Sequence, residues 1–153
     1  MIAGKTPVLV HNNNPHGPNC ATAGHVYRGG IYRDLKDPAT KRNVPGTEIN
    51  HLPSKQSIMP FGIRMKDGPA IQMDYDDHRA VYSTGSSHES QAWQTWQREL
   101  VQSGRIDMAI QMDINDIRNR FGTKYDGAIK EMVAGLGNHA GYQSLRTVPG
   151  VVG

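Results

Sequence analysis

Two short polar stretches carry side chains that could share one reaction. The first, EINHLP at 48–53, places Asn50 directly before His51, and the second, DDHR at 76–79, contains His78. A histidine titrates near neutral pH and can take a proton from water. Histidine, aspartate and asparagine are also reasonable ligands for a divalent cation. We therefore predict a site that combines a general base with a bound cation.

The local sequence indicates how these side chains are presented. Residues 47–53 are expected to be extended and to end at a proline, and side chains alternate between the two faces of an extended segment. Glu48 and Asn50 should then share one face, while His51 points to the other. In the second stretch an aspartate can cap the start of a helix, which would put His78 in the first turn.

The last third of the chain is expected to be helical. Apolar residues recur three or four positions apart within 87–102, 106–121 and 125–135, which is the period of a helix with one buried face. Ser54 is expected to cap a short helical turn that follows it. Residues 137–153 are rich in glycine and are expected to form a flexible tail. Because short extended pieces precede these helices, the predicted fold class is α+β.

The composition limits the class of protein. The 153 residues suit one domain, and 37% of them are apolar, which allows a working core. The net charge is +3, and a positive excess suits a partner rich in phosphate. Cys20 is the only cysteine, which excludes an intrachain disulfide and a cysteine zinc cluster. The sequence has no run of about 18 apolar residues and no classical signal peptide, so we expect no membrane partner.

The first twelve residues, MIAGKTPVLVHN, contain a short β-prone run before a string of asparagines. This segment resembles the last strand of the Hedgehog/intein-type (HINT) self-cleaving domains of RHS-type polymorphic toxins, in which cleavage follows the asparagine. The resemblance implies that 1–12 is the remnant of a processing region and that the toxin follows it. The small and polar residues of 13–25 have the composition of a linker, so the toxin domain is expected at 26–136. Such a toxin would be secreted, or delivered by a bacterial secretion system, and would act in the cytoplasm of a competitor cell.

Three motifs, EINHLP, GPAIQM and DHR, occur in this order at 48–53, 68–73 and 77–79. They resemble the toxin branch of the HNH (His-Me finger) nucleases, whose pattern runs E-x-H-H-x-P, then G-P-A-I-x-M, then D-H-R. The resemblance implies a small ββα-metal nuclease core with additional C-terminal α-helices. The activity that it implies is that of a metal-dependent endonuclease, with DNA favoured over RNA as the substrate.

The same resemblance implies roles for individual residues. His51 matches the general base. Glu48 would assist catalysis by bracing the ring of His51, or would instead pair with a surface lysine. Asn50 matches the first metal ligand, and His78 matches the ligand on the helix, with Asp77 as its neighbour. The site predicted in this way draws its ligands from two separate stretches of the chain.

The remaining expectations concern the substrate, the metal and the partners. Arg79 and Lys55 are candidates to hold the substrate phosphate, with solvated surface residues as the alternative interpretation of both. The metal is expected to be Mg²⁺, with Zn²⁺, Mn²⁺ or Ni²⁺ as alternatives, because Asn50 is a weaker ligand than histidine and Tyr82 stands where some relatives have a second helix histidine. The toxin resemblance also implies a cognate immunity protein, since the producing cell must survive its own nuclease.

Two other functions remain open at the level of sequence. VYRGG at 26–30 is similar to the arginine-bearing strand of ADP-ribosyltransferase toxins, and STGS at 83–86 is similar to their Ser-Thr-Ser strand. The acidic catalytic strand of that class has no counterpart, and the helical last third also argues against it. The chain could alternatively be a non-enzymatic binding module of a toxin.

Overall fold

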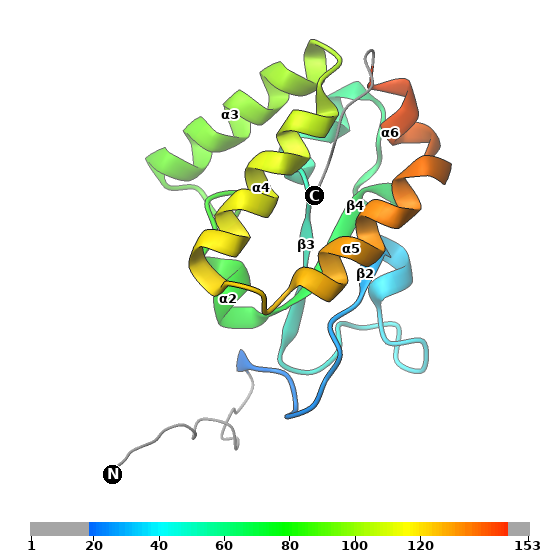
Figure 1. Cartoon of the computed structure of the whole chain (residues 1–153), viewed down its shortest axis with the longest axis vertical. Coiled ribbons are helices and arrows are strands. Elements are labelled where there is room, and N and C mark those ends of the chain that lie inside the picture. The colour runs from blue at the N-terminus through cyan, green and yellow to red at the C-terminus, as the bar shows by residue number, and fades with distance from the viewer. Residues whose placement is uncertain (1–18, 147–153) are drawn as a thin grey trace.

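A three-stranded antiparallel sheet with helices packed on it forms the fold shown in Figure 1. The computed structural model describes residues 19–146. In the order in which they pair, the strands are β2 (Gly29–Ile31), β4 (Pro69–Asp74) and β3 (Thr47–His51). This sheet and the helices confirm the predicted α+β class. The central strand, β4, is buried along its whole length, whereas β3 forms an edge of the sheet.

The helices predicted from apolar periodicity are present with nearly the expected bounds. They are α3 (His88–Gln102), α4 (Ile106–Phe121) and α5 (Asp126–Gly135). Ser87 caps α3 by accepting a hydrogen bond from the backbone N–H of Ser90 at 3.1 Å. No helix within residues 19–146 is long and apolar enough to cross a bilayer. The shorter helical segments are α1 (Lys55–Ile58), α2 (Tyr75–Ala80), α6 (Ala140–Ser144) and the 3-10 turns η3 (Tyr32–Leu35), η4 (Met59–Phe61), η5 (Met65–Asp67) and η6 (Leu136–Asn138).

The main core lies where α4 and α5 cover the sheet (Figure 1). Ile71 and Met73 of β4 are fully buried in it. The backbone of α5 approaches β2 closely, because a Cβ atom at Gly29 would lie 1.9 Å from the carbonyl oxygen of Ala128. Only glycine permits this contact. The helical residues that fill the core around these strands include Ile106, Ile110, Ile114, Ile117, Ile129 and Met132.

The two polar stretches of the sequence are brought together by the pairing of β3 with β4. The register sets Thr47 opposite Asp74 and His51 opposite Ala70. Helix α2 begins directly after β4, so it starts beside the first residues of β3. The chain between the two strands carries α1, η4 and η5. Residues 47–80 therefore form two antiparallel strands followed by a helix, with the polar residues of β3 near α2.

The segment expected to be a linker packs against the sheet from residue 21 onward. Ala21 is buried, and its backbone N–H donates to Asp74 Oδ1 at 2.9 Å. His25 Nε2 lies 3.0 Å from Gln72 Oε1. The small and polar residues up to residue 25 predicted a flexible linker. Composition does not show that the backbone and side chains of such a segment will bond to a distant strand, so the packing of residues 21–25 could not be predicted. The proposed remnant at 1–12, with its expected strand, lies outside the described residues.

The segment expected to be a loose tail is also partly folded. Residues Ala140–Ser144 form α6, and Tyr142 is buried in the main core. His139 caps this helix, because its ring nitrogen Nδ1 accepts a hydrogen bond from the backbone N–H of Tyr142 at 3.0 Å. The prediction of a flexible tail from 137 is therefore wrong up to residue 146. One aromatic side chain anchors a stretch whose glycine content indicated a loop.

Candidate functional site

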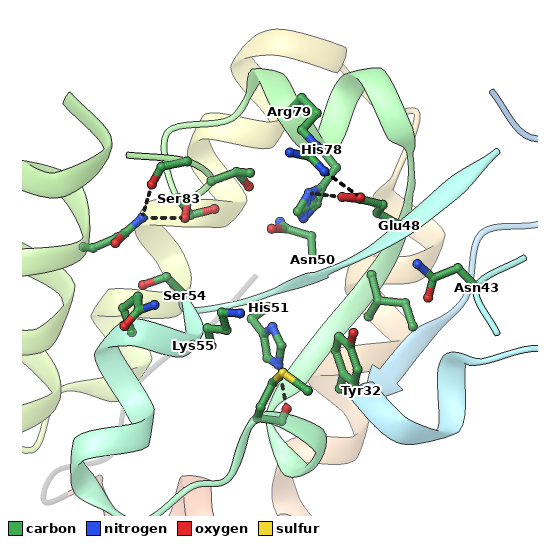
Figure 2. Close-up of a pocket in the computed structure, with 16 residues that line it drawn as sticks. Tyr32, Asn43, Glu48, Asn50, His51, Ser54, Lys55, His78, Arg79 and Ser83 are labelled. Atoms are coloured by element: carbon green, nitrogen blue, oxygen red, sulfur yellow. Dashed lines mark hydrogen bonds and ion pairs between the residues drawn. The ribbon is translucent and has the colours of Figure 1, made fainter. Parts of the chain in front are cut away.

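A cavity of about 350 Å³ lies beside β3 at the edge of the sheet. Figure 2 shows its walls, which come from β3, α1, α2 and the chain before α3. Most of the residues predicted to act in the reaction line this one cavity. Its lining consists of Tyr32, Asn43, Glu48, Ile49, Asn50, His51, Ser54, Lys55, Gln56, Met65, His78, Arg79, Ser83, Thr84, Gly85 and Gln94.

His51, the last residue of β3, is held in one orientation by two neighbours. Its ring stacks on Tyr32 with the centroids 4.6 Å apart and the planes 9° from parallel. Its Nε2 atom lies 2.7 Å from the carbonyl oxygen of Met65 in η5. A carbonyl oxygen can only accept, so Nε2 carries the hydrogen and donates it. In the neutral ring the lone pair is then on Nδ1, which is the nitrogen able to accept a proton.

The surroundings of His51 favour its neutral form. Burial lowers the pKa of His51 below its ordinary value of 6.5, and the nearby charges of Lys55 and His78 lower it further. The hydrogen bond to the carbonyl of Met65 acts in the opposite direction and is the smaller effect. At neutral pH the ring is therefore uncharged and can act as a base.

Glu48 joins β3 to two consecutive residues of α2. Its Oε1 atom accepts a hydrogen bond from Arg79 Nη2 at 3.0 Å. Its Oε2 atom lies 3.3 Å from His78 Nδ1, an ion-pair distance that lacks hydrogen-bond geometry. Burial lowers the pKa of His78, while the carboxylate of Glu48 raises it. Glu48 thus contacts His78 and Arg79, rather than bracing His51 or pairing with a lysine.

Asn50 completes the group of polar residues that β3 presents to the cavity. Its side chain is 3% exposed, and its Nδ2 atom has no hydrogen-bond partner. Figure 2 shows the amide between His78 and His51. The oxygen and nitrogen of such an amide exchange places by a flip of the side chain. Asn50 can therefore offer the cavity either an acceptor or a donor.

Asp77, the other predicted metal ligand, is not brought into this group. Its Oδ2 atom accepts hydrogen bonds from Lys124 Nζ at 2.7 Å and from the Tyr125 hydroxyl at 2.6 Å. Lys124 also bonds to Asp74 Oδ2 at 2.8 Å. Consecutive residues of a helix point in different directions, so Asp77 binds the connection between α4 and α5 while His78 faces the cavity.

The two residues predicted to hold phosphate both line the cavity. Lys55 is the first residue of α1 and is exposed. Arg79 has a side chain that is 55% exposed, and its guanidinium group lies 4.7 Å from the ring centroid of Tyr75. These cations are therefore accessible to a ligand that enters the cavity.

Several lining residues were not singled out by the sequence. Met65 contributes a backbone carbonyl, and no side-chain pattern marks such an atom. Tyr32 belongs to η3 and reaches His51 only because η3 packs against β3, β4 and η5, with the Tyr32 N–H donating to the carbonyl of Gly68 at 2.9 Å. Ser83 appeared only in the comparison with ADP-ribosyltransferases. Arg28, the arginine of that comparison, bonds instead to Glu131 at 2.9 Å and is not among the residues lining the cavity.

The cavity thus combines His51, Glu48, Asn50 and His78, with Lys55 and Arg79 also in its lining. Within the part of the chain that the structure describes, no three His, Cys, Asp or Glu residues are grouped closely enough to hold a metal ion by themselves. Comparison of the chain with protein-family models, curated proteins and solved structures finds no match.

Proposed function

We propose that this protein is a metal-dependent endonuclease, acting on DNA in preference to RNA, with His51 as its general base. The observation that carries the proposal is the hydrogen bond from His51 Nε2 to the carbonyl of Met65. It leaves Nδ1 as the basic nitrogen in a cavity that also holds Glu48, Asn50 and His78. The succession of β3, β4 and α2 supports the ββα arrangement that the resemblance to HNH nucleases implies.

The donor atoms in the cavity suit a hard divalent cation. Glu48 offers a carboxylate and His78 a neutral imidazole, and Asn50 offers an amide oxygen after a flip that exchanges it with the unpartnered Nδ2 atom. Glu48 and His78, which lie 3.3 Å apart, would hold the cation together with Asn50. With few protein ligands, water and substrate oxygens would complete the coordination. Mg²⁺ accepts this arrangement more readily than Zn²⁺ does.

His51 and Met65 would have separate roles in the hydrolysis. His51 Nδ1 removes a proton from water while the water oxygen forms a bond to phosphorus, and the bond from phosphorus to the leaving oxygen breaks. The leaving oxygen takes a proton from solvent. The Met65 carbonyl stabilises the imidazolium, because a charged donor strengthens their hydrogen bond. A bound cation would supply stabilisation of negative charge on the phosphate and the leaving oxygen.

The biological setting is proposed from the sequence alone. The resemblance of residues 1–12 to a HINT processing region supports a toxin that is released from a larger carrier and delivered to a competitor cell. A nuclease of this kind requires a cognate immunity protein in the producing cell. The immunity protein can be tested directly, because it should block cleavage when it is added.

The decisive experiment is cleavage of plasmid DNA with Mg²⁺, with and without EDTA. We expect the parent protein to nick the plasmid and EDTA to stop it, whereas an ADP-ribosyltransferase would require NAD and ignore EDTA. His51→Ala should reduce the rate by roughly 100-fold or more. His88→Ala is the matched control, because His88 is exposed at the start of α3. Near-parent activity of the His51 variant would remove the proposed base.

A further inference from the structure

Four of the five buried side-chain atoms that lack a hydrogen-bond partner in residues 19–146 belong to residues lining the same cavity. Two of them, in Asn50 and His78, belong to the proposed metal site. The other two are the hydroxyl groups of Ser54 and Ser83, whose residues are 4% and 9% exposed. A buried hydroxyl without a partner destabilises a fold, because it has lost its hydrogen bonds to water and gained none in return. Two such groups in residues that line one cavity point to a polar partner for them.

The backbone of Ser54 is fixed, which leaves the hydroxyl as its unused group. Its N–H donates to Gln97 Oε1 at 3.1 Å. Its carbonyl accepts hydrogen bonds from the N–H of Ser57 at 2.9 Å and from the Ser57 hydroxyl at 2.7 Å. Ser54 occupies the N-cap position of α1, yet its side chain makes no capping hydrogen bond. The expected cap is thus absent, and the buried hydroxyl has no hydrogen-bond partner within the described residues.

The chain around Ser83 is held in a similar way. Gln94 Nε2 donates to the carbonyl oxygens of Ser83 at 3.0 Å and Gly85 at 3.2 Å. The Ser90 hydroxyl donates to the carbonyl of Thr84 at 2.7 Å. The carbonyl groups of this turn are therefore tied to α3, while the hydroxyl of Ser83 has no partner.

One helix positions both serines. Gln94 and Gln97 are three residues apart in α3, so they lie on the same side of that helix, and each bonds to one of the two serine-bearing segments. Gln97 is fully buried. Because α3 is a long, capped helix, the backbone that carries the two serines is fixed before a ligand arrives, which reduces the entropy lost on binding.

The charge of this part of the cavity favours an anion. In Figure 2, Ser54, Ser83 and Lys55 lie on one side of Asn50, and Glu48 lies on the other. Glu48 is the only carboxylate among the residues that line the cavity, and it is engaged by Arg79. Hydroxyl donors beside a lysine suit the oxygens of a phosphate group.

We infer that Ser54 and Ser83, together with Lys55, form a phosphate subsite that holds the nucleic-acid strand beside the bond to be cleaved. This inference rests on the proposed endonuclease function and adds the residues that position its substrate. The subsite binds a phosphodiester of the strand, and free phosphate offers the same oxygens as a weaker ligand. Ser54 and Ser83 are positioning residues, because they act on the substrate's placement and not on the proton that His51 removes.

The test measures binding and stability together in a His51→Ala background, in which cleavage no longer interferes. The probe is a fluorescein-labelled DNA duplex in Mg²⁺, followed by fluorescence anisotropy. Ser54→Ala and Ser83→Ala should each weaken binding by about tenfold, the loss expected for one hydrogen bond to a charged group. The same variants should leave the Tm of the free protein unchanged or raise it, because each removes an unpaired buried hydroxyl.

Ser57→Ala is the matched control. Ser57 is buried in the same short helix, but its hydroxyl already donates to the carbonyl of Ser54. Its variant should lower the Tm and leave duplex affinity near the parent value. If Ser57→Ala weakens duplex binding as much as Ser54→Ala does, the effect of Ser54→Ala does not come from a direct contact between Ser54 and the substrate.

The remaining outcomes separate the two proposals. If the parent protein cleaves DNA but both serine variants bind the duplex as tightly as the background protein, the subsite is overturned and the endonuclease stands. If the parent cleaves neither DNA nor RNA, the endonuclease itself is overturned. Inorganic phosphate is the second probe. Suppose that phosphate raises the Tm of the background protein but not of the serine variants, while the variants keep full affinity for the duplex. That result would show that Ser54 and Ser83 bind free phosphate and not the strand, and it would also overturn the subsite.

Discussion

Glu48 of β3 lies 3.3 Å from His78 of α2, so two motifs that are well separated in the sequence meet at one cavity. The contact follows from the pairing of β3 with β4 and from the start of α2 directly after β4. It also sets the proposed metal ligands beside the proposed base. The same geometry makes the roles of the individual residues separable by experiment.

The pH dependence of cleavage should report the ionisation of His51. Burial lowers the pKa of this histidine below 6.5, and a base must be deprotonated to act. The rate should therefore be nearly constant around neutral pH and should fall as the pH drops through the lowered pKa. Initial rates between pH 5 and pH 10, at saturating Mg²⁺ and constant ionic strength, would measure this. A rate that kept rising from pH 8 to pH 10 would point to a different base.

The metal requirement should distinguish His78 from its neighbour Asp77. His78 faces Glu48 in the cavity, whereas Asp77 bonds to Lys124 and Tyr125. His78→Ala should raise the Mg²⁺ concentration for half-maximal cleavage by roughly tenfold or more. Asp77→Asn should leave that concentration unchanged and instead lower stability by about 1 kcal/mol, because it weakens two hydrogen bonds.

Cleavage titrated with Mg²⁺, combined with urea unfolding, would measure both effects. Equal Mg²⁺ requirements for parent and His78→Ala would show that His78 is not a ligand. A large increase for Asp77→Asn, with unchanged stability, would restore Asp77 to the site that the sequence predicted.

Stability should depend on pH through Asp113, a buried residue of α4 outside the cavity. Its Oδ1 atom accepts a hydrogen bond from Trp93 Nε1 at 2.8 Å, and its Oδ2 atom has no partner. Burial raises the pKa of Asp113 to about 7, whereas an unfolded aspartate titrates near 3.9. The free energy of unfolding is therefore not reduced by Asp113 below about pH 4, where the carboxyl group is neutral in both the folded and the unfolded state. It decreases above that pH, and the loss is complete once the pH has risen through 7.

Asp113→Asn should remove this dependence while keeping an acceptor for Trp93. At pH 8 we expect the variant to melt roughly 4 °C or more above the parent, and at pH 5 we expect the difference to shrink. Thermal unfolding followed by circular dichroism at both pH values would measure it. A variant less stable than the parent at pH 8 would mean that the ionised carboxylate is well accommodated.

The proposed site was only partly predictable from the sequence. The strand ending at His51, the turn at Lys55 and the helix holding His78 follow from local signals, and these residues do line one cavity. Asp77 was placed among the ligands because it adjoins His78, but the orientation of a helix residue depends on what packs around the helix. Its partners, Lys124 and Tyr125, come from a connection far along the chain.

The sequence by itself determined the long helices and the α+β class, because apolar periodicity is a local property that survives in any packing arrangement. Only the tertiary structure decided which ring nitrogen of His51 is free, where Asp77 points and that the hydroxyls of Ser54 and Ser83 remain unpaired. Each of these depends on contacts between segments distant in the chain. Such contacts are set by strand register and helix packing, and no short motif encodes them.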